Sequence, residues 1–222
     1  MTSTTDSRSY AFAFLIRAAE DLPADFDLPR DLPPFSCGVF LPQAAPDWYG
    51  RRAYPPRVLL LSPDRLTAIA HRASGEAAQT IPLRDLRFVE YGHFLLSGWI
   101  TFATPEGRRE FRFNTRTSRP VEEWLRALSR QWAPAADGCH ARECVPAGSA
   151  LSIKFRNAES AALDPDEHLV ARFFHTPAKV GLPADYVGIT NRRLIWITDR
   201  NRGRCERFGW IVRWAPLTRR FR

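Results

Sequence analysis

The sequence predicts a mainly β protein with few helices, in which two similar strand-rich segments follow one another. Short apolar segments are bounded by turns rich in Pro, Asp and Gly, and only one segment has a strong helical period. In addition, DYVGITNRRLIWITDR at 185–200 resembles RVLLLSPDRLTAIAHR at 57–72. The 222 residues are enough for two domains of about 100 residues, each with its own core.

Residues 1–34 are predicted to form an acidic, Pro-rich lead-in. Asp-Leu-Pro occurs three times in EDLPADFDLPRDLPP, and proline disfavours the helical conformation both for itself and for the residue before it. The apolar segment SYAFAFLIRAAEDL at 9–22 could form a short amphipathic helix. A second break, at 134–150, lacks a hydrophobic period and predicts a linker.

Residues 35–133 are predicted to be a β unit closed by one helix. The expected strands are CGVF before Pro42, VLLL and LTAIAH around a Ser-Pro-Asp-Arg turn, QTIPL, LRFVEY, and GWITFAT and RREFRFN around Pro-Glu-Gly. The helix is SRPVEEWLRALSRQW, because its apolar residues repeat at i, i+3, i+4, i+7 and i+11. These residues are Val121, Trp124, Leu125, Leu128 and Trp132.

Residues 151–222 are predicted to repeat part of this unit. An offset of 128 aligns Arg65 with Arg193 and also aligns the turn and both flanking strands. Upstream, VFLP at 39–42 resembles FFHTP at 173–177, and downstream IPL at 81–83 resembles APL at 215–217. A competing alignment pairs the two GWI segments at 98–100 and 209–211, and it would make the second copy internally shortened.

The order of a strand, a loop, a hairpin with TNRRLIW, an IPL segment, a second hairpin and a terminal amphipathic helix resembles bacterial pleckstrin-homology-like and GRAM-like domains. The resemblance covers 35–132, and 151–222 in part; ITNRRLIWI is its most recognisable segment. It implies a PH-like barrel of two nearly orthogonal antiparallel sheets, capped by the C-terminal helix.

The second copy lacks the last hairpin and the helix of the first, and this would leave strand edges and an apolar face uncovered. The N-terminal segment, the first domain or another subunit could complete it. A truncated gene is the alternative.

In many eukaryotic members of the pleckstrin-homology family, a basic motif around the loop between the first two strands holds inositol phosphates. The matching loop here combines aromatic residues with arginines, but the family's lysine near the end of the first strand is replaced by Phe40 and Leu41. A solvated loop with packed aromatics is the alternative to a headgroup or partner site. The candidate ligand-binding residues are Trp48, Tyr49, Arg51, Arg52, Tyr54, Arg57, Arg192 and Arg193.

The net charge of +8 favours an anionic partner. The C-terminal segment NRGRCERFGWIVRWAPLTRRFR interleaves arginines with aromatics, as nucleic-acid surfaces do. An amphipathic strand with buried aromatics gives the same pattern and is the favoured interpretation.

The sequence offers little support for an enzyme. Asp164, Asp166 and His168 would share one face of a strand, but Asp-Pro-Asp-Glu is more typical of a turn before a strand. No GxSxG, phosphate-binding glycine loop or HExxH segment is present. Cys139, His140 and Cys144 lack the second close pair of a zinc site. We therefore expect no catalytic residue, no metal and no cofactor.

These observations predict a non-enzymatic interaction module that docks to a protein partner or to itself. Peripheral binding to anionic membrane lipid is the alternative, and nucleic-acid binding is a further one that rests on charge. No small-molecule substrate is expected. Because no apolar run approaches the roughly 20 residues of a membrane span and no secretory signal is evident, the protein is expected in the cytoplasm, with contact to the inner membrane face left open.

Overall fold

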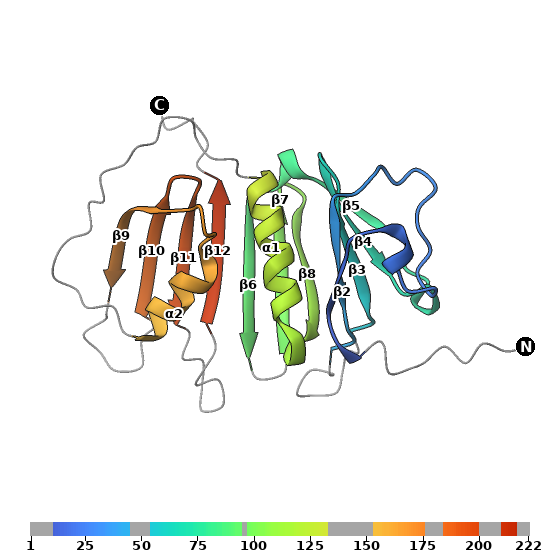
Figure 1. Ribbon diagram of the computed structural model, residues 1–222, viewed down its shortest axis with the longest axis horizontal. Coiled ribbons are helices and arrows are strands. Elements are labelled where there is room, and N and C mark those ends of the chain that lie inside the picture. The colour runs from blue at the N-terminus through green and yellow to red at the C-terminus, as the bar shows by residue number, and fades with distance from the viewer. Residues whose placement is uncertain are drawn as a thin grey trace, which may run out of the picture. The chain divides into compact units, whose positions relative to one another are not determined.

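The protein is mainly β, as the sequence predicts. The computed structural model describes residues 11–44, 54–94, 97–132, 153–175, 184–199 and 210–216. Its strands form two antiparallel sheets, one with strand order β1-β2-β3-β4-β5 and one with order β8-β7-β6-β12-β11-β10-β9 (Figure 1).

The five-stranded sheet, called the first sheet below, contains β1 (Phe14–Ile16), β2 (Cys37–Leu41), β3 (Arg57–Leu61), β4 (Arg65–Ala70) and β5 (Gln79–Pro82). The seven-stranded sheet, called the second sheet below, contains β6 (Phe88–Phe94), β7 (Ser97–Thr104), β8 (Gly107–Asn114), β9 (Leu169–His175), β10 (Ala184–Thr190), β11 (Arg193–Asp199) and β12 (Trp210–Pro216). The helices are α1 (Arg119–Trp132) and α2 (Ile153–Ala162), with short 3-10 turns η2 (Ala19–Asp21), η3 (Arg72–Ser74), η4 (Leu83–Asp85) and η5 (Thr115–Thr117).

The chain divides into two compact units, each made of several segments. Unit 1 comprises Met1–Leu86, Leu96–Gly98 and Phe111–Leu128, and unit 2 comprises Arg87–Leu95, Trp99–Glu110 and Ser129–Arg222. The predicted linker at 134–150 lies outside the described residues.

The strands and the helix predicted between residues 35 and 133 are confirmed, with ends that agree to within a few residues. The hairpin between β7 and β8 turns through Gly107, whose φ of 137° is a conformation that side-chain-bearing residues rarely adopt. In α1, the predicted apolar positions Val121, Trp124 and Leu128 are fully buried. α2 is an element that the sequence analysis does not predict.

The predicted N-terminal amphipathic helix is wrong, because Phe14–Ile16 forms a strand that pairs with β2. Phe14 and Ile16 alternate to the same side of this strand and join the core of the first sheet, where Phe14 stacks on Phe40 with ring centroids 4.9 Å apart. Pairing with β2 provides partners for the backbone N–H and C=O groups that a free edge would leave without them. The described part of the N-terminal segment therefore covers the first sheet.

Two four-stranded segments, β2 to β5 and β9 to β12, share one pairing pattern. The hairpin pair Leu61↔Leu66 corresponds to Ile189↔Leu194, at the predicted offset of 128. The neighbouring strands agree as well: Val39↔Leu59 corresponds to Phe173↔Val187, and Leu66↔Ile81 corresponds to Leu194↔Ala215. This pattern follows the alignment of IPL with APL, whereas the competing GWI alignment would set a segment of β7 against the start of β12.

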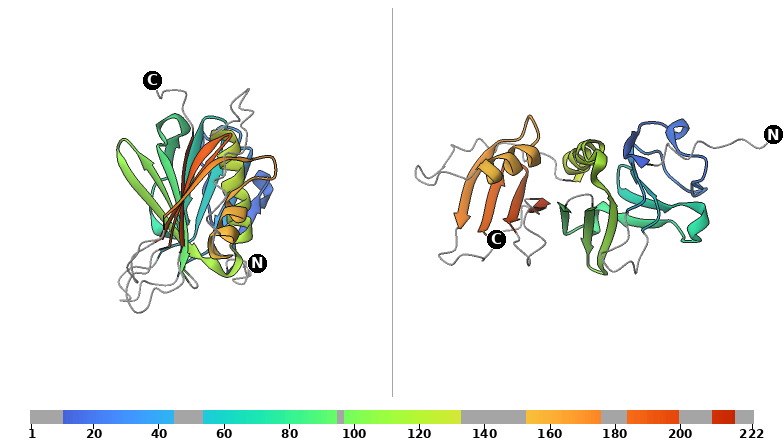
Figure 2. Two further views of the ribbon diagram at one scale, coloured as in Figure 1. Left: turned by 90° about the vertical axis from the view of Figure 1, so that its left-hand side faces the viewer. Right: turned by 90° about the horizontal axis from the view of Figure 1, so that it is seen from below.

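Helix α2 covers one face of the second sheet (Figure 2, right). Phe155 of α2 meets the rings of Phe174 and Tyr186, with centroids 5.0 and 6.3 Å away. The corresponding positions of the first sheet, Phe40 and Val58, are buried in a cluster that includes Ile16 and Phe26 of the N-terminal segment. The N-terminal segment and α2 therefore cover corresponding faces of the two sheets.

The C-terminal strand β12 pairs with β6 along the register Trp210↔His93 to Trp214↔Val89. Of the three completions that the sequence left open, a strand from the predicted first domain therefore occupies this edge. The other edge of the β9 to β12 segment is β9, which is also one end of the seven-stranded sheet.

Candidate interaction surface

The second face of strands β9 to β11 is apolar and exposed. Phe173, Val187 and Trp196 are directly opposite one another on adjacent strands, so their side chains form one row on this face. Phe173 is 61% exposed and Trp196 41% exposed. We call this surface the open face; it consists of Ala171, Phe173, Val187, Ile189, Leu194 and Trp196, none of which is buried.

The same face of the first sheet is buried. Val39, Leu59 and Ala68, which correspond by register to Phe173, Val187 and Trp196, are all at most 1% exposed. The next row, Leu61 and Leu66, is also fully buried. Among the described residues, a face that is interior in the first sheet is thus partly exposed in the second, although the registers of the two sheets match.

The open face has one polar margin. Asp185 accepts hydrogen bonds from the indole Nε1 of Trp196 at 3.1 Å and from the hydroxyl of Thr198 at 2.9 Å. These bonds hold the Trp196 ring in place on the surface. An aromatic side chain fixed in this way loses little conformational freedom when a partner covers it.

A buried ion pair supports the turn between β10 and β11. Arg193 donates two hydrogen bonds to Glu167, from Nε to Oε1 at 2.9 Å and from Nη2 to Oε2 at 2.8 Å, and a third to the carbonyl of Ala162 at 2.7 Å. Thr190 donates to the same carboxylate at 2.6 Å. The turn and the loop before β9 are therefore joined through the Glu167 side chain.

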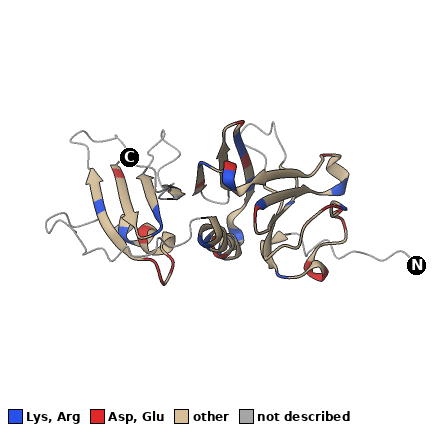
Figure 3. Ribbon diagram, turned by 90° about the horizontal axis from the view of Figure 1, so that it is seen from above, with Lys and Arg blue, Asp and Glu red and all other residues tan. Residues whose placement is uncertain are grey.

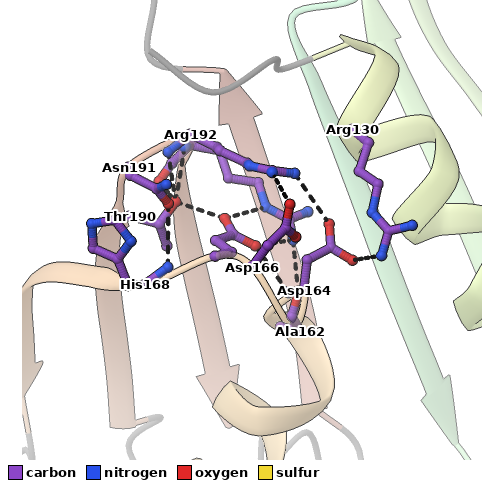
Figure 4. Close-up of polar contacts among 10 residues, drawn as sticks. Arg130, Ala162, Asp164, Asp166, His168, Thr190, Asn191 and Arg192 are labelled. Carbon is purple, nitrogen blue, oxygen red and sulfur yellow. Dashed lines mark hydrogen bonds and ion pairs between the residues drawn. The ribbon is translucent and has the colours of Figure 1, made fainter. Parts of the chain in front are cut away.

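Around this pair lies a second layer of charges (Figure 4). Arg192 reaches from the turn to Asp166 and lies 3.9 Å from Asp164, while Arg130 from the last turn of α1 donates to Asp164 at 3.2 Å. His168 and Asn191 close the loop, because the His168 N–H donates to the side-chain Oδ1 of Asn191 and the Asn191 N–H donates to the His168 carbonyl. The Asp-Pro-Asp-Glu segment is thus a turn before β9, as the sequence favoured.

The two buried carboxyl groups of this network have opposite pKa shifts. Burial raises the pKa of Asp164, and the charges of Arg130 and Arg193 offset this only in part. Burial acts on Glu167 in the same sense, but the hydrogen bonds and charge of Arg193 outweigh it and hold the pKa of Glu167 below its ordinary value. Glu167 is therefore the anion on which this turn depends.

Arg192 and Arg193, which the sequence analysis selected as ligand-binding residues, both bind carboxylates of this chain. The side chains are only 10% and 4% exposed. Three arginines face three acidic groups here, so the local charge is balanced. Acidic and basic positions are also interspersed along the strands and helices of each unit (Figure 3).

The remaining predicted site residues lie in the loop before β3 or, in the case of Arg57, at the start of β3. Trp48, Tyr49, Arg51 and Arg52 lie outside the described residues. Arg57 pairs with Glu76 at 2.6 Å and lies over the Phe111 ring, 5.8 Å from its centroid.

The nearby Arg112 lies over the ring of Tyr54 at 5.0 Å. In unit 1, Tyr54 and Arg57 thus contact Arg112 and Phe111 of β8, as the packed-loop interpretation expects. Whether they also bind an anion stays a prediction.

Within the described residues, no three His, Cys, Asp or Glu side chains are grouped in a way that could hold a metal ion. The predicted cluster of Cys139, His140 and Cys144 lies outside them. In the same part of the chain, no helix has the length and hydropathy needed to cross a bilayer.

Comparison with known proteins gives no match to any family model, to any curated protein or to any solved structure. The interpretation of this surface therefore rests on its own geometry.

Sequence reasoning did not identify Phe173 and Trp196 as surface residues. The signal was present, because β9 to β11 carry apolar residues at successive positions and thus on both faces. Both faces of such strands need a cover. In the described part of the second half, α2 packs on one of these faces.

Proposed function

We propose that this protein is a non-enzymatic interaction module of pleckstrin-homology-like type, with one complete and one incomplete unit, that docks a protein partner on the open face. The exposure of Phe173 and Trp196 carries this proposal. Their counterparts in the first sheet, Val39 and Ala68, are buried. The open face therefore has the apolar composition of a protein core but is exposed.

The physical cost of this exposure favours a partner. Apolar surface contributes about 25 cal/mol for each Å² removed from water, and a contiguous exposed apolar patch typically marks an interaction site. Tryptophan and other large aromatics are the residues that contribute most at protein interfaces. A docked protein that supplies apolar side chains would bury the open face, as the corresponding face of the first sheet is buried within the chain.

An anion-binding role has weaker support. Arg192 and Arg193 are bound to Asp166 and Glu167, and Arg57 is bound to Glu76. A phosphate would have to displace these carboxylates, and the buried Glu167 would then lack its counter-ion, which costs several kcal/mol.

The test uses the immobilised full chain with extract from its source cells, and the variants Phe173→Ser and Trp196→Ser. Phe12→Ser is the matched control, because Phe12 is another exposed aromatic residue, 48% exposed, on the N-terminal segment. We expect a stoichiometric protein that the wild type and Phe12→Ser retain and that both open-face variants lose.

Equal retention by all four chains would overturn the proposal. Sedimentation with anionic vesicles that persists in both open-face variants and is lost on substitution of Arg51 and Arg52 would favour the membrane alternative instead.

A further inference from the structure

We propose that a second copy of the same chain pairs antiparallel with β9, which is an edge strand of the described sheet. This inference goes beyond the proposed docking on the open face, because it adds a separate contact at the edge of the same sheet. It starts from the four edge strands that the described sheets contain, β1, β5, β8 and β9.

Three of these edges carry features that discourage pairing with another chain. β1 has only three residues, and β5 has four and ends at Pro82. β8, with the sequence GRREFRFN, carries three arginines and a glutamate. Short length, proline and charge are the usual protections of an edge strand.

β9 lacks these protections. Its seven residues, LVARFFH, include no proline and one formally charged residue, Arg172. The Arg172 guanidinium lies 4.0 Å from Glu159 of α2, on the face that α2 covers. The side of β9 that belongs to the open face therefore presents Ala171, Phe173 and His175 without a charged neighbour on the strand.

One register of β9 against a second copy of itself brings aromatic residues together and keeps the arginines apart. A two-fold axis perpendicular to the sheet keeps each face on its own side, so one residue of β9 must lie opposite itself. An axis at Arg172 would set two like charges against each other, which destabilises a strand pair. An axis at Phe173 sets the two Phe173 rings against each other on the open face.

In the Phe173 register, Arg172 lies opposite Phe174 of the second copy on the α2 face. A guanidinium beside an aromatic ring is a favourable contact, and symmetry makes it twice. The row of Phe173, Val187 and Trp196 would then continue across the axis into the same row of the second copy. An apolar surface of twice the width results, and the backbone groups of both β9 edges gain partners.

The decisive experiment exploits the residue that faces itself. Phe173→Lys and Phe173→Glu each place like charges across the axis, whereas a mixture of the two places opposite charges there. We expect the wild-type full chain to dimerise with concentration in analytical ultracentrifugation, and each variant alone to dissociate at least about tenfold more readily. An equimolar mixture should recover the dimer, which also demonstrates that both variants are folded.

Trp196→Lys is the control. Trp196 lies two strands from the β9 edge, about 10 Å away at the usual strand spacing, so this variant should keep the dimer. If Trp196→Lys abolishes the dimer as completely as Phe173→Lys, the copies pack through their open faces and edge pairing is wrong. A mixture of Phe173→Lys and Phe173→Glu that stays monomeric also overturns the inference.

The second-copy inference and the proposed function fail in different ways. A wild-type chain that is monomeric at all concentrations, but retains a different protein through Phe173 and Trp196, overturns the second copy and leaves the interaction role intact. A wild-type chain that neither dimerises nor retains any protein through these residues overturns both.

Discussion

Arg193 and Glu167 form a buried bidentate ion pair that joins the β10–β11 turn to the loop before β9. The side chains are 4% and 0% exposed, and their two hydrogen bonds measure 2.9 and 2.8 Å. Arg65 occupies the same position in the β3–β4 hairpin, and there it pairs with its neighbour Asp64 at the surface. One turn position thus carries a buried pair in the second sheet and an exposed pair in the first.

Replacement of Glu167 by Ala should unfold unit 2 under milder conditions, because it leaves Arg193 buried without a counter-ion. Loss of one partner from a buried pair costs about 3–5 kcal/mol. Urea unfolding of the full chain, followed by tryptophan fluorescence, measures the change. Asp64→Ala is the matched control and should shift the transition far less, since solvent screens that pair; equal shifts would contradict the assigned role.

Stability should fall as the pH decreases through 4.5, the ordinary pKa of a glutamate, because the pKa of Glu167 is lower in the folded chain. The unfolded chain then takes up the proton first, so acid favours unfolding. Glu167→Gln removes this uptake and should flatten the acid side of a plot of thermal midpoint against pH. An unchanged slope would show that another group titrates there.

Asp164 should act in the opposite sense, because its pKa is raised in the folded chain by burial. Its ionised form destabilises the fold, and this cost disappears as the pH decreases from the raised pKa toward the ordinary value of 3.8. Asp164→Asn removes the stability that protonation of Asp164 regains at low pH. The acid side of the same plot of thermal midpoint against pH should therefore become steeper. A slope that becomes shallower in both variants would be inconsistent with the assigned shifts.

The N-terminal segment should be a structural part of unit 1, although the sequence suggests only a lead-in. Phe26 is buried against Phe40 and His71, with ring centroids 5.9 and 5.6 Å away. Phe26→Ala should cost about 3–5 kcal/mol in the free energy of unfolding, as for other buried phenylalanines. Phe12→Ala, an exposed position, should leave the urea midpoint unchanged, and the comparison fails if the two variants behave alike.

The strands could be predicted because their signals are local. Alternation, turn residues and proline define Cys37–Leu41 and Gly107–Asn114 without any knowledge of their neighbours. The same holds for α1, whose buried stripe follows the helical period. The correspondence of the two hairpins also follows from sequence, since Leu61 and Ile189 precede turns of equal length.

The rest depends on pairing between distant segments. Whether Phe14–Ile16 becomes a helix or a strand is decided by β2, which lies more than twenty residues away. The partner of Arg193 could not be predicted either, because four acidic residues between 159 and 167 could reach it and only the fold selects Glu167. The apolar residues on both faces of β9 to β11 are visible in the sequence, but which face stays exposed depends on the packing of distant segments.

Gly92 of β6 should be indispensable to the position of Trp99 on β7. A Cβ at Gly92 would lie 2.3 Å from the nearest atom of the Trp99 ring, too close for any real contact, so the ring must move. Trp99 Nε1 donates to Glu90 Oε1 at 3.2 Å, and that hydrogen bond should be lost as well. We expect Gly92→Ala to cost about 1–3 kcal/mol, the usual range for overpacking.

A double-mutant cycle separates this contact from a general intolerance of β6 to substitution. In a Trp99→Ala background, Gly92→Ala has no ring to displace and should cost little, so the two changes couple strongly. Tryptophan fluorescence should report a more solvated indole in the single variant Gly92→Ala. If the two costs in the free energy of unfolding simply add, the strain lies in the backbone of β6. Gly92 would then be required by the strand itself and not by the Trp99 ring.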